Sequence, residues 1–232
     1  MEVSKLTEIS NLVLEAVELA SDIVMEIYNS GDLKVEDKHD GSPVTIADKK
    51  CHEILFNSLK SIDANIPILS EEGDTEENKE DLFWLIDPLD GTKEFINKNG
   101  EFTVNVALIE DGMPILGVVS APAVNETFIG FAGRAFKIQG KEKIEITSQK
   151  QSEEFCLVTV SKSHKSEKDQ AFINLCEKKF TEVKELPTGS SLKLCRVAEG
   201  KANIYSRLGP TYQWDIAAGQ AVVEASGGLI SS

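Results

Sequence analysis

The stretch Phe83–Phe95, FWLIDPLDGTKEF, decides how we interpret the fold, because it joins an apolar run to two aspartates three positions apart. The residues FWLI predict a short buried strand. Pro88 fixes its own backbone torsion and steers Asp87 away from helix, so we expect the chain to turn as the strand ends. This turn would bring Asp87 and Asp90 together in one small volume.

Two carboxylates this close repel each other, and a divalent cation would remove the conflict. Mg²⁺ prefers carboxylate and carbonyl oxygens, so the backbone carbonyl of Leu89 is a further candidate ligand. Gly91 lets the backbone approach a ligand closely, and TKEFI predicts a helix whose free N–H groups can bind phosphate oxygens. The alternative is an ordinary turn in which Asp90 or Thr92 caps that helix.

Three other segments place carboxylates at comparable points of the predicted structure. They are ILSEEGD with Glu71 and Glu72, SPVTIAD with Thr45 and Asp48, and YQWDIAAG with Asp215. Each has a simpler interpretation: a solvated acidic loop for the glutamates, a capping box for the T-x-x-D pair, and a helix cap for Asp215. All four segments place carboxylates at the end of a predicted strand or the start of a predicted helix, and this similarity favours a shared metal site.

The composition narrows the function classes. The chain has 232 residues, of which 41% are hydrophobic, and a formal net charge of −15. This acidity argues against nucleic acid and anionic membranes as partners, and a phosphate substrate would need cations to neutralise the carboxylates around it. Four cysteines without a CxxC pair predict reduced thiols. No signal peptide or membrane-spanning run is evident, so we expect a cytoplasmic protein, either free or peripheral at the inner face of the membrane.

Periodicity divides the chain into two predicted halves. Residues 1–135 form an α+β half for metal and phosphate, and residues 136–232 form an α/β half for specificity. Helical spacing predicts helices over about 6–27, 45–60, 167–179 and 214–225. The segments FTVNVALI and MPILGVVSAP predict a hairpin that ETFIGF and RAFKI continue as a meander, while strands are also expected at IPILS, near 156–160 and at NIYSR.

Taken in order, the segments SEE, WLIDPLDGTKEF and WDIAAG resemble the inositol monophosphatase-like family of metal-dependent, lithium-sensitive phosphatases. The family signature is D-P-[IL]-D-G-T, with an E-E pair upstream and W-D downstream. The resemblance implies an α+β / α/β layered sandwich of the inositol monophosphatase and fructose bisphosphatase type, in which helix and sheet layers alternate. Family members continue past GGLISS, where this chain stops, so we expect a short C-terminal tail and an exposed sheet edge in the second half.

Within the family, the chain is most similar to the CysQ-type 3'(2'),5'-bisphosphate nucleotidases. The segments NGEFTVN, SKSH, GSSLK and RLGPT carry this likeness, whereas inositol phosphatases usually have D-G-T-x-N-F and lack NGEFTVN and RxGPT. The implied activity is Mg²⁺-dependent conversion of adenosine 3',5'-bisphosphate to AMP and phosphate. An inositol or fructose 1,6-bisphosphate phosphatase and a catalytically weak nucleotide or phosphate sensor remain as alternatives.

The resemblance also implies roles for individual residues around two or more Mg²⁺ ions. Glu71, Asp87 and the Leu89 carbonyl would hold the first ion, and Asp87, Asp90 and Asp215 the second. Thr92 would orient the attacking water, and Asp48 would act as the proton relay for that water. Glu71 would also be a catalytic residue, because it holds the first Mg²⁺ ion. Glu72 would orient ligands or water.

Substrate contacts are implied in both halves of the chain. The resemblance assigns the reacting phosphoryl group to the N–H groups of Gly91 and Thr92, and the nucleotide to a set from the second half. That set is His164, Ser190, Lys193, Arg207 and Asp215. A lone histidine or an exposed basic residue is otherwise an ordinary solvated side chain. The predicted partner is a small phosphorylated nucleotide, and the sequence leaves a homodimer open.

Overall fold

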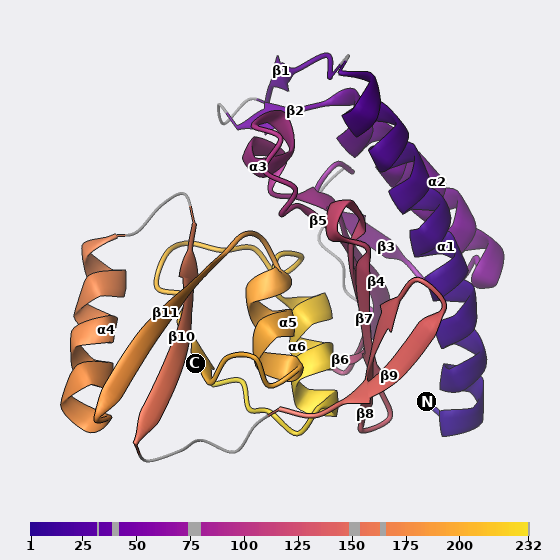
Figure 1. Cartoon of the computed structure of the whole chain (residues 1–232). Helices are drawn as coiled ribbons and strands as arrows, with labels where there is room; N and C mark the ends of the chain where they lie inside the picture. Colours follow the sequence, from indigo (N-terminus) through magenta and orange to yellow (C-terminus); the bar gives the residue numbers. More distant parts are fainter. Residues whose placement is uncertain (32, 39–41, 74–79, 149–153, 163–165, 232) are drawn as a thin grey trace.

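The computed structural model describes residues 1–31, 33–38, 42–73, 80–148, 154–162 and 166–231. Helix and sheet layers alternate across the molecule (Figure 1). Helices α1 (Val3–Ser30) and α2 (Ile46–Ile62) cover one face of a large sheet, and α5 (Leu192–Ala198) and α6 (Ala217–Ala225) cover the other. A smaller sheet follows, with α4 (Glu167–Lys179) outermost. The predicted layered sandwich is therefore present.

Within the described residues, the large sheet has seven strands in the order β3-β4-β5-β6-β7-β8-β9. Its strands are β3 (Ile68–Ser70), β4 (Leu82–Asp90), β5 (Thr103–Glu110), β6 (Met113–Ala121), β7 (Glu126–Phe131), β8 (Arg134–Gln139) and β9 (Glu142–Ile146). β3 and β4 run parallel, whereas each later neighbouring pair is antiparallel. A short helix η1 (Pro122–Val124) joins β6 to β7.

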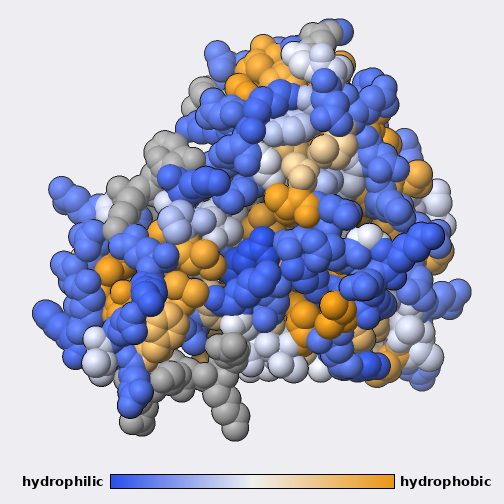
Figure 2. Space-filling model, viewed as in Figure 1, coloured by the Kyte–Doolittle hydropathy of each residue, from blue (hydrophilic) through white to orange (hydrophobic). Residues whose placement is uncertain are grey.

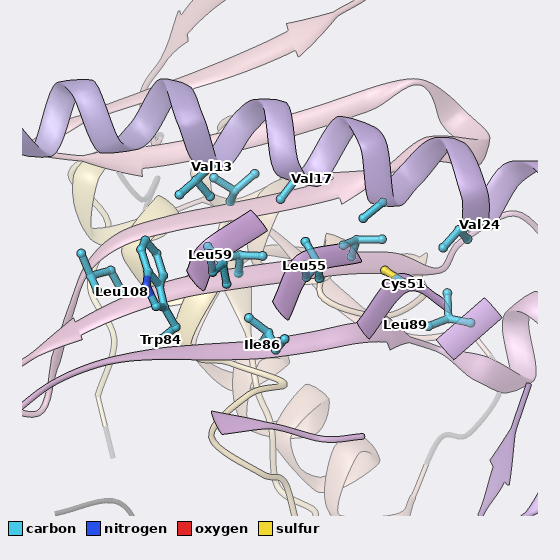
Figure 3. Close-up of a cluster of buried hydrophobic side chains, with 14 of the residues drawn as sticks. Val13, Val17, Val24, Cys51, Leu55, Leu59, Trp84, Ile86, Leu89 and Leu108 are labelled. Carbon is cyan, nitrogen blue, oxygen red and sulfur yellow. The ribbon is translucent and has the colours of Figure 1, made fainter. Parts of the chain in front are cut away.

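Strand β4 shows how side-chain alternation builds two cores around the large sheet. Trp84 and Ile86 pack with α1 and α2, together with Val13 and Leu55, as Figure 3 shows. Leu85 lies between them in sequence and packs instead in the cluster that includes residues of α5 and α6. The same alternation places Asp87 on the face of the sheet that α5 and α6 cover. The second half of the chain therefore lies next to this carboxylate.

Helix α6 lies unusually close to the large sheet because two strand residues have no side chain. A Cβ atom at Gly117 in β6 would lie 2.2 Å from the carbonyl oxygen of Ala218, and one at Gly130 in β7 would lie 2.5 Å from the Cα atom of Val222. Any larger residue would push the helix away. Because α6 follows directly after Asp215, this close packing also determines where that carboxylate lies.

The smaller sheet has the order β11-β10-β12 in the described chain. Its strands are β10 (Phe155–Ser161), β11 (Glu182–Thr188) and β12 (Ile204–Tyr205), all parallel. Helix α5 packs on the inner face of this sheet and α4 on the outer face. A separate pair of strands, β1 (Glu36–Asp37) and β2 (Pro43–Val44), lies beside the large sheet near helix α3 (Thr92–Ile96).

Three details differ from the sequence predictions. β4 does not end at Asp87 but continues to Asp90, with a register shift between these residues in its pairing with β5. Helix α6 begins at Ala217 rather than near Trp214. β9 extends the large sheet past residue 139 although three of the five residues in EKIEI are charged, and four of the five are exposed, where charged side chains remain solvated. The division at residue 135 stays a prediction.

The face in Figure 2 is mostly hydrophilic, and its apolar groups are scattered among polar ones. Within the described ranges, no helix combines the length and the apolarity that crossing a membrane requires.

Candidate active site

The centre of the candidate site forms where parallel strands β3 and β4 end at the same edge of the large sheet. Ser70 pairs with Ile86, and the N–H of Glu71 donates to the carbonyl oxygen of Ile86 at 3.2 Å. Parallel strands in register bring their following residues together. Glu71 and Asp87 therefore meet although sixteen positions separate them in the chain.

Glu71, Asp87 and Asp215 can each offer one carboxylate oxygen such that these oxygens lie within 4.8 Å of one another. Asp87 is 1% exposed, and its Oδ1 accepts from the N–H of Leu89 at 3.1 Å. Its Oδ2 has no hydrogen-bond partner among the described residues. Burial, and then the charges of Asp90, Glu71 and Asp215, raise the pKa of Asp87 well above its ordinary value. An unpartnered buried oxygen among carboxylates fits a divalent cation.

Asp90 lies beside this group and contacts the second half of the chain. Its Oδ2 accepts from the hydroxyl of Ser191 at 2.7 Å. Burial raises the pKa of Asp90 to about 6, against the opposing effects of the Lys193 charge and the Ser191 hydrogen bond. Asp90 thus remains harder to ionise than an ordinary aspartate, although a lysine is close.

Asp215 does not cap α6, which begins two residues later. Its Oδ2 accepts from the hydroxyl of Thr211 at 2.8 Å and from the N–H of Tyr212 at 3.0 Å. Its backbone carbonyl is 3.1 Å from the hydroxyl of Ser191. Asp215 therefore closes the loop before α6, and this loop directs the side chain toward Asp87.

The predicted capping box at Thr45 and Asp48 is present, and the same carboxylate also reaches the aspartate turn. Oδ2 of Asp48 accepts from the N–H and the hydroxyl of Thr45 at 2.7 and 2.6 Å. Oδ1 accepts from the hydroxyl of Thr92 at 3.3 Å, and this hydroxyl is also 3.3 Å from the Leu89 carbonyl. Burial raises the pKa of Asp48 to about 6 against the lowering effect of the Thr45 hydrogen bonds.

Gly91 joins the aspartates to α3 in a conformation that suits glycine, with φ of 88°. A Cβ atom here would lie 2.2 Å from the hydroxyl oxygen of Ser190. Glycine is therefore required at position 91 for two reasons. Its backbone torsion is unfavourable for other residues, and Ser190, about one hundred positions later in the chain, lies too close for a side chain. Thr92 begins the five-residue helix α3 directly after it.

Six of the predicted site residues line one cavity of about 160 Å³ next to the carboxylates. They are Asp90, Gly91, Ser190, Lys193, Arg207 and Asp215. The ammonium group of Lys193 donates to the carbonyl oxygens of Ser190 and Thr188 at 2.9 and 3.3 Å, and burial lowers the pKa of Lys193. Arg207 is exposed and donates to the Pro210 carbonyl at 3.1 Å. The cavity lining therefore combines the carboxylates of Asp90 and Asp215 with the cations of Lys193 and Arg207.

Some predicted residues lie elsewhere. His164 falls outside the described residues. Among the described residues, Asp48, Glu71, Asp87, Leu89 and Thr92 do not line the cavity. The hydroxyl of Ser190 is within 2.7 Å of the Glu101 carbonyl and 3.0 Å of the Asp90 carbonyl, so its proton is already donated to backbone oxygen.

Sequence reasoning missed Lys38 and Ser191. The ammonium group of Lys38 lies 2.7 Å from Oε1 of Glu71 and 2.5 Å from Oε1 of Glu72. Burial alone would lower the pKa of Lys38, but the hydrogen bonds and charges of both glutamates outweigh it and raise this pKa. Lys38 stands just before the turn segment HDGSPV, where no periodicity singles it out. Ser191 was part of the recognised GSSLK segment, but its neighbour Ser190 was selected.

A model of the inositol monophosphatase family matches residues 5–232. The 3'(2'),5'-bisphosphate nucleotidase CysQ of Escherichia coli K12 is 42% identical over 90% of this chain and 84% of that protein. The corresponding CysQ of Buchnera aphidicola is 42% identical over 92% of this chain and 80% of that protein.

Two solved structures share the fold. CysQ from Bacteroides thetaiotaomicron has a TM-score of 0.82 and 34% identity, and covers 95% of this chain and 87% of its own. The extragenic suppressor protein SuhB from Bartonella henselae has a TM-score of 0.76 and 25% identity over 95% of this chain and 85% of its own. These matches confirm the predicted fold class. Because the family model and the relatives span almost the whole chain, this protein belongs to the inositol monophosphatase family.

Proposed function

We propose that this protein is a metal-dependent phosphatase that removes the 3'-phosphate of adenosine 3',5'-bisphosphate and releases AMP and phosphate. The observation that carries the proposal is the buried, unpartnered Oδ2 of Asp87 beside Glu71 and Asp215, next to a cavity whose lining includes Asp215 together with Lys193 and Arg207. The names of the CysQ relatives, which are 42% identical over most of the chain, support the choice of substrate.

The residues present suit two Mg²⁺ ions. Glu71, Asp87 and the Leu89 carbonyl would hold one, and Asp87, Asp90 and Asp215 the other, with Glu72 orienting ligands or water. When bound, such ions lower the pKa of a coordinated water and stabilise the attacking and leaving oxygens. The raised pKa of Asp87 and the repulsion that contributes to it are relieved by the same positive charge.

Thr92 and Asp48 supply the proton path in this proposal. The Thr92 hydroxyl has two acceptors at 3.3 Å, the Asp48 carboxylate and the Leu89 carbonyl. When it donates to Asp48, its oxygen lone pairs are free to accept from the attacking water and so orient it. With a pKa of about 6, Asp48 is ionised at neutral pH and can take the proton. Its other oxygen remains tied to Thr45, which fixes the carboxylate.

The cations in the cavity lining would bind the rest of the nucleotide. Lys193 and Arg207 provide positive charge, and the guanidinium of Arg207 can donate two hydrogen bonds to one phosphate. The N–H groups of Gly91 and Thr92 would hold the reacting phosphoryl group. Ser190 would contribute through its backbone or its lone pairs, because its proton is already donated. His164 is kept as a proposed contact from the sequence resemblance alone.

The test is phosphate release from adenosine 3',5'-bisphosphate and from inositol 1-phosphate, measured side by side with Mg²⁺ and then with EDTA. We expect release that needs Mg²⁺ and strongly favours the nucleotide. Preference for the inositol ester would be consistent with the proposed metal site but would contradict the proposed nucleotide substrate. If neither ester is hydrolysed, calorimetric binding of the nucleotide would identify a sensor, and absence of binding would overturn the proposal altogether.

A further inference from the structure

The segment Asn99–Asn105, NGEFTVN, is one of the segments that carry the resemblance to the nucleotidases, yet the proposed mechanism gives it no task. Its polar residues Glu101 and Asn105 both reach across to Thr188–Ser191, the TGSS segment that leads into α5. We name residues 188–191 the docking segment. It brings Ser190 to the cavity and Ser191 to Asp90.

Glu101 holds the docking segment through its side chain and its backbone. Oε2 accepts from the N–H of Gly189 at 2.7 Å, and its carbonyl oxygen accepts from the hydroxyl of Ser190 at 2.7 Å. A Cβ atom at Gly189 would lie 2.7 Å from Cβ and from the carbonyl oxygen of Glu101. The contact is therefore close enough to require glycine. Oε1 of Glu101 is in turn 3.2 Å from the ammonium group of Lys162, at the end of β10.

This contact maintains an unfavourable backbone conformation. Ser190 has φ of 46°, in the left-handed region that non-glycine residues rarely adopt. Such a torsion persists only where surrounding contacts over-determine it. The bonds at Gly189 and Ser190 provide these contacts, and they place the cavity face of the docking segment against Gly91.

Asn105 acts on the other end of the docking segment. It is 1% exposed and lies opposite Asp87 in the β4–β5 pairing. Its Nδ2 donates to the hydroxyl oxygen of Ser191 at 3.1 Å, and this hydroxyl donates to Oδ2 of Asp90 at 2.7 Å. The single proton of Ser191 has two possible acceptors, Oδ2 of Asp90 at 2.7 Å and the backbone carbonyl of Asp215 at 3.1 Å, and the shorter contact to the charged oxygen is the stronger one. The chain of bonds holds one oxygen of Asp90 and leaves the other for a cation.

We propose that Glu101 and Asn105 are positioning residues that divide this work between them. Glu101 determines how the docking segment presents the binding site for the second phosphate, and so determines nucleotide affinity. Asn105 acts through Ser191 on Asp90, and so determines cation affinity. The inference rests on the proposed function for its substrate, but the contacts themselves can be tested without one.

The Glu101 part is tested with Glu101→Ala, Glu101→Gln and the control Glu145→Ala, whose glutamate pairs with Arg134 on the exposed surface. Steady-state kinetics would use adenosine 3',5'-bisphosphate and p-nitrophenyl phosphate, which has no second phosphate. We expect Glu101→Ala to raise the nucleotide KM about tenfold, the effect of one lost charge-assisted hydrogen bond. Its kcat and its p-nitrophenyl phosphate turnover should remain close to those of the parent.

Glu101→Gln retains an acceptor oxygen and should recover most of the nucleotide affinity. Equal losses on both substrates would overturn the specificity role.

The Asn105 part predicts a different signature. Asn105→Ala and Ser191→Ala should each weaken Mg²⁺ binding about tenfold in calorimetry without substrate, and should raise the Mg²⁺ concentration for half-maximal activity to the same extent, as loss of a group that orients a metal ligand does. The double variant should be no worse than either single variant, because both remove the same chain of bonds. Asn174→Ala is the control, since Asn174 is exposed on α4. An unchanged Mg²⁺ requirement with a raised nucleotide KM would overturn the assignment to Asp90.

Hydrogen exchange of the unliganded protein separates failure of this inference from failure of the proposed function. Glu101→Ala should speed exchange of the Gly189 amide, and Glu101→Gln should speed it less, whichever substrate the enzyme uses. If the bisphosphate nucleotide is not hydrolysed but exchange responds in this order, the substrate is wrong and the contact stands. If exchange at Gly189 is unchanged in Glu101→Ala, the contact itself is refuted.

Discussion

The carboxylates of the active site contrast with a second group of acidic residues between β7, β8 and α5. In that group, Glu126 and Glu199 are paired with Lys137 and Arg196. Arg196 is 2.8 Å from Oε2 of Glu126, and Lys137 is 3.1 Å from Oε2 of Glu199. The protein therefore supplies its own cations here. At the active site, Oδ2 of Asp87 has neither a hydrogen-bond partner nor a cation within ion-pair distance among the described residues, whereas Oε2 of Glu126 lacks a well-directed hydrogen bond but lies next to the Arg196 guanidinium.

The pKa values follow this difference. Burial alone would raise the pKa of Glu126, but the hydrogen bonds from Lys137 and Arg196 outweigh it, and the pKa is lowered. For Asp87 and Asp90, burial prevails and the pKa is raised. The comparison teaches that a buried carboxylate is not in itself a functional sign. What distinguishes Asp87 is that none of the described residues compensates the charge on its Oδ2, although Lys38 pairs with Glu71 and Glu72 and the Lys193 charge acts on Asp90.

The largest expected effect comes from removing one charge at the active site. Asp90→Asn should lower kcat by more than about a hundredfold, because removing even a group that orients a ligand costs about 10–100-fold. The substitution conserves volume, so the melting temperature without metal should be equal or higher. Glu126→Gln is the matched variant in the paired group, and its kcat should stay near that of the parent. Full activity in Asp90→Asn would contradict the two-ion proposal.

The two groups should also respond oppositely to pH. Asp48 and Asp90 have folded pKa values of about 6, above the ordinary value of 3.8. The folded state therefore binds protons more tightly, and without metal its stability falls as pH rises from about 4 to about 6. Glu126 has a lowered pKa, so its contribution is present above its ordinary value of 4.5 and is lost as pH falls through the folded pKa.

Urea unfolding in EDTA across pH 4–7 measures this difference. For Asp48 alone, a shift of about two pKa units corresponds to about 3 kcal/mol in the free energy of unfolding. The parent should lose this stability relative to Asp48→Asn as pH rises, and Mg²⁺ should restore part of the stability of the active-site aspartates at neutral pH. Parallel pH curves for the parent and Asp48→Asn would show that the carboxylate is not strained by burial.

Disrupting the paired group should change stability rather than catalysis. Glu126→Ala removes a partner from Lys137 and from Arg196, which each keep Glu199. We expect the free energy of unfolding to fall by about 1.5–3 kcal/mol, the range for hydrogen bonds to charged groups. The KM for Mg²⁺ and for nucleotide should be unchanged in the folded enzyme. A selective loss of metal affinity would show that the two groups are coupled.

The smallest effect is expected at an exposed cation. Arg207→Ala should raise the KM for the bisphosphate nucleotide about tenfold, because one charge-assisted contact is lost in partial competition with water. Hydrolysis of a simple sugar phosphate should barely change. Equal losses for the two substrates would remove Arg207 from the specificity role and leave the uncompensated aspartates unaffected.

Local spacing was enough to predict much of the chain. The helix expected at 167–179 coincides with α4 because Ser166 and Asp169 form a capping box before a periodic segment. The convergence of Asp87 with Asp90 also followed from a three-residue interval around Pro88, although the strand continues to Asp90. β9 was missed because a mostly exposed strand need not contain an apolar pattern.

Local spacing therefore predicted the principal helices and strands, the family resemblance and the acidic residues of the aspartate turn, because bond geometry limits what neighbours in the chain can do. Which distant groups meet depends on the packing of the whole chain. Examples are Glu71 beside Asp87, Asp48 at 3.3 Å from Thr92, and Ser191 on Asp90. These contacts depend on how strands pair and how layers pack, and the same side chains in another packing would be ordinary caps and solvated charges.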